Sequence, residues 1–211
     1  MVDIIRKEEL TQILDVIVEV MEGAKDELIE LDGAMGDGDL GLTMVKGFSA
    51  VAEEIRTIDE TDMGKIMMKL GMKMNSTVPS TMGTLVSICF LKAAPAAKGK
   101  TELTLVDMVA MGKGAVAGVM DRGKSKPGDK TMLDALHPAV EALSKAAEAG
   151  DSLADAWQKA YEAARDGVEQ TKSMQSVHGR AAYYQEKSIG RQDPGATAMM
   201  YIVSGVAKAV R

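Results

Sequence analysis

The chain has 211 residues, 46% of them hydrophobic, and this length and composition suit a single domain spanning residues 1–211. Its 25 basic and 31 acidic residues give a formal net charge of −6, so we expect no nucleic-acid partner, since nucleic-acid-binding proteins carry a positive balance or a positive block. No apolar run approaches the roughly 20 residues that cross a bilayer, residues 1–9 lack a signal-peptide core, and the single cysteine excludes a disulfide framework, so we expect no membrane contact and a cytoplasmic location.

The apolar residues predict an all-α fold. There are 17 methionines and only 3% aromatic residues, and alanine, methionine and leucine favour helices whereas aromatic and β-branched residues favour strands. The first helix shows the pattern best, because Leu10, Ile13, Leu14, Ile17 and Met21 recur at spacings of three and four with acidic residues between them. The same periodicity predicts eight amphipathic helices, at residues 7–30, 40–57, 62–75, 80–98, 104–120, 130–148, 152–171 and 194–209.

Most connections between these helices are short and rich in glycine or proline, so neighbouring helices should run antiparallel. The connection between Thr171 and Gln192 is an exception, because the helical period weakens there and polar and basic residues gather. A connection of about 20 residues inside a domain is more often functional than idle. A disordered flap and a helix with a weak pattern are the alternative interpretations.

Three carboxylates gather between the first two expected helices, at Asp32, Asp37 and Asp39, with glycines at 33, 36 and 38. Converging carboxylates repel one another unless a cation lies between them, and oxygen ligands without histidine indicate Mg²⁺. An EF-hand is excluded, because the twelfth loop position counted from Asp32 is Thr43, which is not acidic. The alternative is a glycine-rich turn with an aspartate N-cap and no metal.

Residues 118–125 match the P-loop pattern of two glycines followed by lysine and serine. That motif binds phosphate only between a buried strand and a helix. Here the preceding residues have the pattern of a helix, and Pro127 follows closely after Ser125, so no helix starts there. We interpret this match as chance.

Three further segments could bind an anion or simply cap helices. Ser80 or Thr81 is expected to cap the next helix, whose free N–H groups would attract an anion. Asp129 is expected to cap the helix that follows it, and Pro194 to start the last one. Arg180 is a candidate phosphate or sugar contact, or a solvated loop charge.

Four motifs follow one another in the chain: Asp32 with Gly-Asp-Gly-Asp at 36–39, Pro-Gly-Asp-Lys-Thr-Met at 127–132, Gly179-Arg180, and Gln-Asp-Pro-Gly-Ala-Thr at 192–197. In this order they resemble the nucleotide-binding subunit of dihydroxyacetone kinases. The resemblance covers residues 10–203, and the second and fourth motifs are the most specific.

The resemblance implies that the eight antiparallel helices form a barrel with a nucleotide and Mg²⁺ site at one end. Asp32, Asp37 and Asp39 would hold two Mg²⁺ ions that bridge the phosphates of ADP or ATP. The positions that match the family's nucleotide pocket are Leu40, Gly41, Leu42, Thr43, Thr81, Met82, Gly123, Met132, Arg180, Asp193, Pro194 and Gly195.

The resemblance also implies a partner, a separate kinase subunit that binds the short-chain ketose covalently through a histidine. This chain alone should therefore not phosphorylate the sugar. The family uses ATP as the donor in fused enzymes, or keeps ADP bound and has it rephosphorylated by a phosphotransferase-system phosphocarrier. A free-standing chain of 211 residues resembles the second arrangement.

The sequence departs from the family pattern where phosphates should lie. Leu40 and Thr43 replace a histidine and an asparagine, and Pro79-Ser80-Thr81-Met82 replaces a glycine-rich helix start. Leucine offers no hydrogen bond where histidine offers one. We expect a retained site with altered preference, for example for a tetrulose. The alternatives are a non-catalytic regulatory relative and, with less support, a helical bundle with an unrelated role.

Overall fold

The protein, described here by a computed structural model of residues 4–211, is built entirely from helices within that range. The predicted all-α fold is confirmed, and the ends of the eight predicted helices differ from the observed ones by at most three residues. Residues 1–3 of the predicted single domain lie outside the described residues. The α-helices are α1 (Lys7–Gly33), α2 (Leu40–Thr57), α3 (Met63–Thr77), α4 (Thr81–Ala97), α5 (Leu105–Gly123), α6 (Leu133–Ala149), α7 (Leu153–Thr171) and α8 (Pro194–Ala209).

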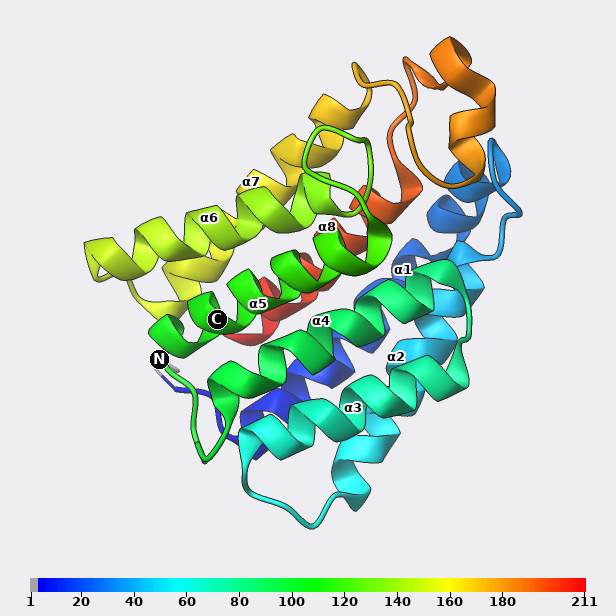
Figure 1. Ribbon diagram of the computed structural model, residues 1–211. Helices are drawn as coiled ribbons and strands as arrows, with labels where there is room; N and C mark the ends of the chain where they lie inside the picture. The colour runs from blue at the N-terminus through cyan, green and yellow to red at the C-terminus, as the bar shows by residue number, and fades with distance from the viewer. Residues whose placement is uncertain (1–3) are drawn as a thin grey trace.

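The helices form a closed ring, as the resemblance implied. Each packs against the next in the chain, and α8 returns to pack against α1 (Figure 1). Consecutive helices run in opposite directions, so α2, α4, α6 and α8 all begin at the same end of the barrel, where α1, α3, α5 and α7 end. The positive ends of four helix dipoles therefore gather at that end.

The core is rich in methionine, like the sequence as a whole. Met21, Met44, Met63 and Met74 are fully buried, and this flexible side chain fills irregular gaps between helices. Cys89 packs against the same core, and burial raises the pKa of its thiol to about 12, which agrees with a structural role. No helix in residues 4–211 has both the length and the apolar character of a membrane span.

The start of α6 differs from the prediction. The helix begins at Leu133 rather than at residue 130, and Asp129 does not cap it. Lys130 has a left-handed backbone (φ 59°), so residues 126–132 form a loop instead of a helical turn. The Asp129 carboxylate accepts a hydrogen bond from the Lys126 amide (2.9 Å) inside this loop, and the Asp134 carboxylate accepts one from the Thr131 amide (2.7 Å), so α6 begins without a side-chain cap.

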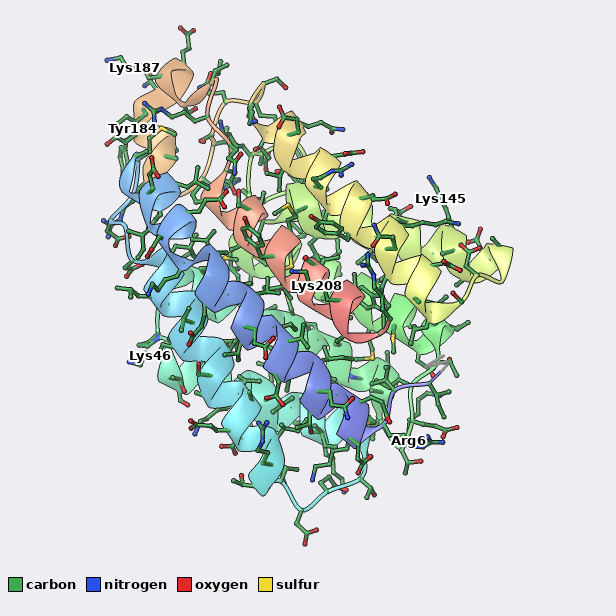
Figure 2. All side chains as sticks on the ribbon, turned by 180° about the vertical axis from the view of Figure 1, so that it is seen from behind. Arg6, Lys46, Lys145, Tyr184, Lys187 and Lys208 are labelled. Carbon is green, nitrogen blue, oxygen red and sulfur yellow. The ribbon has the colours of Figure 1, made fainter. Side chains whose placement is uncertain are left out.

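The long connection between α7 and α8 is neither a plain loop nor a continuous helix. It contains a 3-10 helix, η1 (Arg180–Ser188), interrupted by Gln185, whose φ is 51°. Figure 2 shows Tyr184 and Lys187 of η1 at the end of the barrel opposite Arg6. The alternative of a helix with a weak pattern therefore holds in part, because a broken 3-10 helix leaves no 3.6-residue period in the sequence.

Candidate functional site

A cavity of about 520 Å³ opens at the end of the barrel where the even-numbered helices begin. The end of α1, the start of α4, the loop before α6 and the α7–α8 connection all line it. A second cavity of about 510 Å³ adjoins it and shares Ser80, Thr81, Met132 and Gly179 with it. The combined space is elongated, with an acidic end at Asp32 and an end without carboxylates near Arg122 and Gly123.

The acidic end is formed by Asp32, Asp37 and Asp39, each of which offers a carboxylate oxygen within 4.8 Å of the others. The Asp32 carboxylate accepts hydrogen bonds from the amides of Asp39 (3.1 Å) and Leu40 (3.4 Å), which fold the turn back onto α1. Gly36 is required in this turn, because a Cβ there would lie 2.7 Å from the Asp32 backbone carbonyl oxygen. Three converging oxygens of this kind fit a hard divalent cation such as Mg²⁺.

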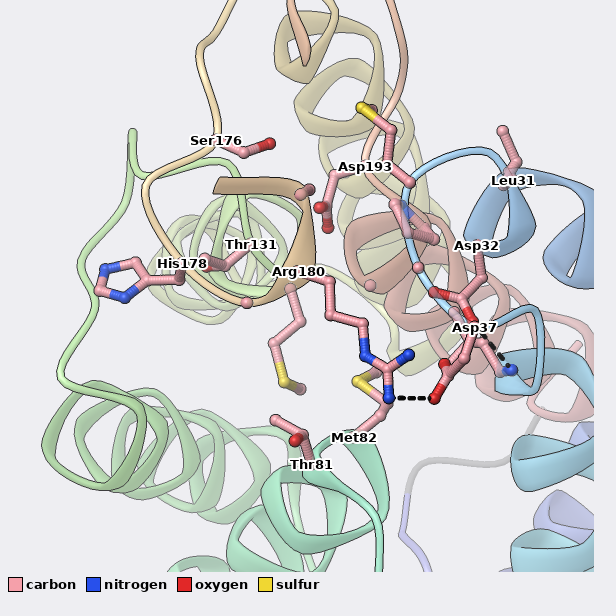
Figure 3. A pocket seen from close by; sticks show the side chains of 18 of the residues that line it. Leu31, Asp32, Asp37, Thr81, Met82, Thr131, Ser176, His178, Arg180 and Asp193 are labelled. Atoms are coloured by element: carbon pink, nitrogen blue, oxygen red, sulfur yellow. Dashed lines mark hydrogen bonds and ion pairs between the residues drawn. The ribbon is translucent and has the colours of Figure 1, made fainter. Parts of the chain in front are cut away.

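The negative charges of the three carboxylates repel one another. Burial raises the pKa of Asp32, and the neighbouring charge of Asp37 adds to this effect. Arg180 supplies one compensating charge, because its guanidinium lies 2.7 Å from Asp37 Oδ2. Figure 3 shows Arg180 reaching across the cavity to Asp37, with Thr81 and Met82 at the start of α4 below this contact. A bound cation would add to this compensation directly at the carboxylates.

The start of α4 forms the wall opposite the carboxylates. Ser80 is its N-cap, as predicted, and its hydroxyl accepts a hydrogen bond from the Gly83 amide (3.0 Å). The chain turns so tightly that a Cβ on Gly83 would lie 2.1 Å from the Val78 carbonyl oxygen. Thr81 and Met82 line the cavity in the first turn, where the backbone N–H groups have no partner within the helix. This wall can therefore attract anionic oxygens.

The start of α8 closes a third side. Pro194 is at the start of the helix, as predicted, and Asp193 caps it by accepting a hydrogen bond from the Ala196 amide (2.7 Å). Burial raises the pKa of Asp193 to about 7, and the nearby charge of Asp134 contributes. Burial also lowers the pKa of Lys130, which lies in the same region.

Most positions taken from the resemblance are brought together by the fold. Those that line the first cavity are Asp32, Asp37, Asp39, Leu40, Thr81, Met82, Met132, Arg180, Asp193, Pro194 and Gly195. Gly123 lines the adjoining cavity. Gly41, Leu42 and Thr43 line neither, because a helix presents only one face to a cavity and Leu40 takes that place in α2. Leu42 is 57% exposed instead.

Several residues of the cavity had no role assigned from the sequence. Lys130, Ser176 and His178 line it, although the first belongs to a motif that carried the resemblance. The Ser176 hydroxyl is buried and has no hydrogen-bond partner among residues 4–211. The only signal for Ser176 and His178 was their place in the unusually long connection. The P-loop-like residues 118–125 begin within α5, so no strand precedes them, in agreement with the interpretation as chance.

Comparisons with known proteins agree with the resemblance. A family model described as the DAK2 domain matches residues 34–208. The ADP-binding subunit DhaL of the PEP-dependent dihydroxyacetone kinase of Escherichia coli is 38% identical over 193 residues, which cover 92% of each chain. D-erythrulose kinase of Mycolicibacterium smegmatis is 32% identical over 93% of this chain and 34% of its own length. The crystal structure of the C. freundii dihydroxyacetone kinase with AMP-PNP and Mg²⁺ superposes with a TM-score of 0.72 at 24% identity, over 94% of this chain and 33% of that one, and shows the same fold.

Proposed function

Because the chain belongs to the DAK2 domain family, a family of kinase subunits, we propose that it is the ADP- or ATP-binding, Mg²⁺-dependent subunit of a kinase that phosphorylates a short-chain ketose. One observation carries the proposal: three carboxylates converge opposite the N-terminus of α4, at one end of an elongated cavity. Such a pair of walls suits a cation and the phosphates it accompanies. We further propose that residues 1–211 form one nucleotide-binding helical domain.

In this proposal the acidic end holds the phosphates and the end near Gly123 holds the base. Asp32, Asp37 and Asp39 would hold two Mg²⁺ ions, whose chemistry is to neutralise phosphate oxygens. The amides at the start of α4 and the Arg180 guanidinium add positive charge to the same place, which is most of what a phosphoryl-transfer site requires. The base would extend past Met132 towards Gly123.

The acceptor hydroxyl would come from a partner. We propose a separate ketose-binding kinase subunit, so this chain needs no general base of its own, and it supplies none beyond the metal–phosphate site. The relative from Escherichia coli is named as the ADP-binding subunit of a PEP-dependent kinase. That name supports rephosphorylation of a retained ADP by a phosphotransferase-system phosphocarrier. A cytoplasmic location stays a prediction.

Leu40 and Met82 bear on the alternative, a non-catalytic relative that binds nucleotide and regulates. Leu40 is 6% exposed and packs in the hydrophobic core, and its amide donates a hydrogen bond to the Asp32 carboxylate (3.4 Å). The retained contact between Arg180 and Asp37 favours the kinase subunit, because a closed site would not need it. The similarity to D-erythrulose kinase supports a tetrulose as a candidate ketose.

Thermal denaturation with Mg²⁺ alone, and with Mg²⁺ plus ADP or ATP, tests the proposal. At 100 times the dissociation constant, binding adds about 2.7 kcal/mol, which raises the Tm by roughly 5–10 °C at this size. We expect this shift only when metal and nucleotide are both present, and its loss in Asp37→Asn. No shift in a protein that mass spectrometry shows to be free of nucleotide would favour the regulatory alternative. Transfer of phosphate to a ketose-loaded partner subunit separates the two functions.

A further inference from the structure

Lys130 has an unusual environment for a lysine. Its side chain is buried (2% exposed), and its ammonium donates hydrogen bonds to three backbone carbonyl oxygens, those of Ser188 (2.5 Å), Arg191 (2.7 Å) and Met174 (3.1 Å). An ammonium has three donors, so all of them are used. No carboxylate lies within hydrogen-bond distance of this ammonium in the described part of the chain; only the more distant charge of Asp193 favours its protonation.

The three carbonyl groups belong to both arms of the α7–α8 connection. Met174 lies on the arm that leaves α7, whereas Ser188 and Arg191 lie on the arm that returns to α8. Lys130 therefore ties the two arms together at their base. The Ser188 hydroxyl reinforces this contact, because it accepts a hydrogen bond from the Ser176 amide (2.9 Å) on the opposite arm.

Asp129 forms a second attachment between the loop before α6 and the α7–α8 connection. Its carboxylate lies 3.2 Å from Nε2 of His178, and its backbone carbonyl accepts a hydrogen bond from the Val177 amide (3.4 Å). Arg180 follows His178 by two residues and lies between the two arms that Lys130 holds. The attachments at Lys130 and Asp129 thus lie on either side of the segment that carries Arg180 to the cavity.

We propose that Lys130 is a positioning residue that fastens the α7–α8 connection across the cavity and thereby sets where the Arg180 guanidinium lies. The left-handed backbone at Lys130 belongs to the same arrangement. It keeps residue 130 out of α6, which begins at Leu133, and it directs the lysine side chain into the α7–α8 connection. The inference rests on the proposed function for the claim that Arg180 meets phosphate. The attachment itself does not depend on nucleotide.

Hydrogen exchange of the nucleotide-free full chain tests the attachment directly. Lys130→Met removes the charge and all three donors while keeping a long, flexible side chain. We expect faster exchange confined to residues 172–192, including the amides of Ser176 and Gly190, with the helices of the barrel unchanged. Lys126→Met is the matched control, since Lys126 is exposed and lies on the same loop, and it should leave the exchange pattern unaltered. Unchanged exchange in Lys130→Met, or faster exchange throughout the barrel, would overturn the proposal.

Ser188→Ala provides a second route to the same question if Lys130→Met does not fold. It leaves the lysine in place and removes the hydroxyl that joins the two arms. We expect faster exchange in the same segment, although over fewer residues. An unchanged segment in this variant would contradict the proposal independently of Lys130.

A double-mutant cycle with Arg180→Gln tests what the attachment serves. We expect Lys130→Met to weaken Mg²⁺-dependent ADP binding by roughly 10- to 100-fold, the loss of one charge-assisted contact. In the Arg180→Gln background the same change should have little further effect, because the contact is already absent. Additive losses would show that Lys130 acts by another route and would overturn the positioning role. If the wild-type chain binds no nucleotide with Mg²⁺, the proposed function fails, whereas the exchange experiment still decides the attachment.

Discussion

Because Arg180 contacts Asp37, we expect Arg180→Gln to change the affinity for Mg²⁺ alone and the affinity for Mg²⁺-nucleotide in opposite directions. Both side chains are largely exposed, so the pair itself adds little stability, at most about 1 kcal/mol. Arg180→Gln leaves the Asp37 carboxylate free for a cation, so Mg²⁺ alone should bind slightly more tightly, by less than about fivefold. Mg²⁺-nucleotide should bind about tenfold more weakly, because a charge near the phosphates is lost. Isothermal titration calorimetry measures both.

Lys187→Gln is the control for this substitution, because it removes one positive charge from an exposed position in η1 that does not line the cavity. It should leave both affinities unchanged. Equal nucleotide affinity in Arg180→Gln and the wild type would place Arg180 outside the phosphate site.

Asp193 predicts a pH dependence of stability. Burial raises its pKa in the folded protein to about 7, well above the unfolded value, so the folded state binds more protons between these two values. The free energy of unfolding that depends on this group is therefore present at low pH and is lost as the pH rises towards 7. Asp193→Asn does not ionise and can still cap α8. The Tm of Asp193→Asn relative to that of the wild type should therefore rise as the pH increases from 5 to 8, which differential scanning calorimetry measures. A constant difference across this range would contradict the raised pKa.

At the scale of elements, the close approach of α1 and α2 positions the acidic cluster. Gly41 makes this approach possible, because a Cβ there would lie 2.2 Å from the Lys25 carbonyl oxygen. Gly41→Ala should force the helices apart and lower the free energy of unfolding by about 1–3 kcal/mol. That corresponds to a fall in Tm of roughly 2–12 °C, measured by circular dichroism. Mg²⁺ affinity should fall as well, since Asp32 lies in α1 and Asp39 is the N-cap residue of α2.

Gly23→Ala is the matched control for this pair of helices. It makes the same change in the exposed interior of α1, where a new Cβ meets nothing within 4 Å. It should raise the free energy of unfolding by about 0.5–1 kcal/mol through helix propensity. A similar stabilisation in Gly41→Ala would mean that the helices can adjust without loss.

The elements show what the sequence could predict and what it could not. The eight α-helices follow from local periodicity, and the caps at Ser80 and Asp193 follow from local chemistry. The predicted cap at Asp129 is wrong because Lys130 takes a left-handed backbone to reach carbonyl groups more than 40 residues away in sequence. The placement of Leu42 depends on how α2 is rotated against α1, which a single helix does not encode.

The whole molecule places an acidic cluster on a chain that already carries a net charge of −6. Four helix N-termini at the same end offset part of this charge, but a dipole end amounts to only about half an elementary charge. A free nucleotide therefore meets repulsion that a divalent cation removes. In EDTA we expect ADP to bind at least about 100-fold more weakly than with Mg²⁺, because at least two metal–phosphate contacts are lost.

Asp37→Asn should reduce the dependence of ADP affinity on Mg²⁺. The substitution removes a ligand for the cation and also one negative charge that faces the phosphates. We expect weaker ADP binding with Mg²⁺ and slightly stronger ADP binding in EDTA, by up to about fivefold, as for an exposed charge pair. Equilibrium dialysis with radiolabelled ADP at one ionic strength measures both. Weaker binding under both conditions would mean that Asp37 supports the shape of the turn rather than the cation, because only a role in charge gives the two changes opposite signs.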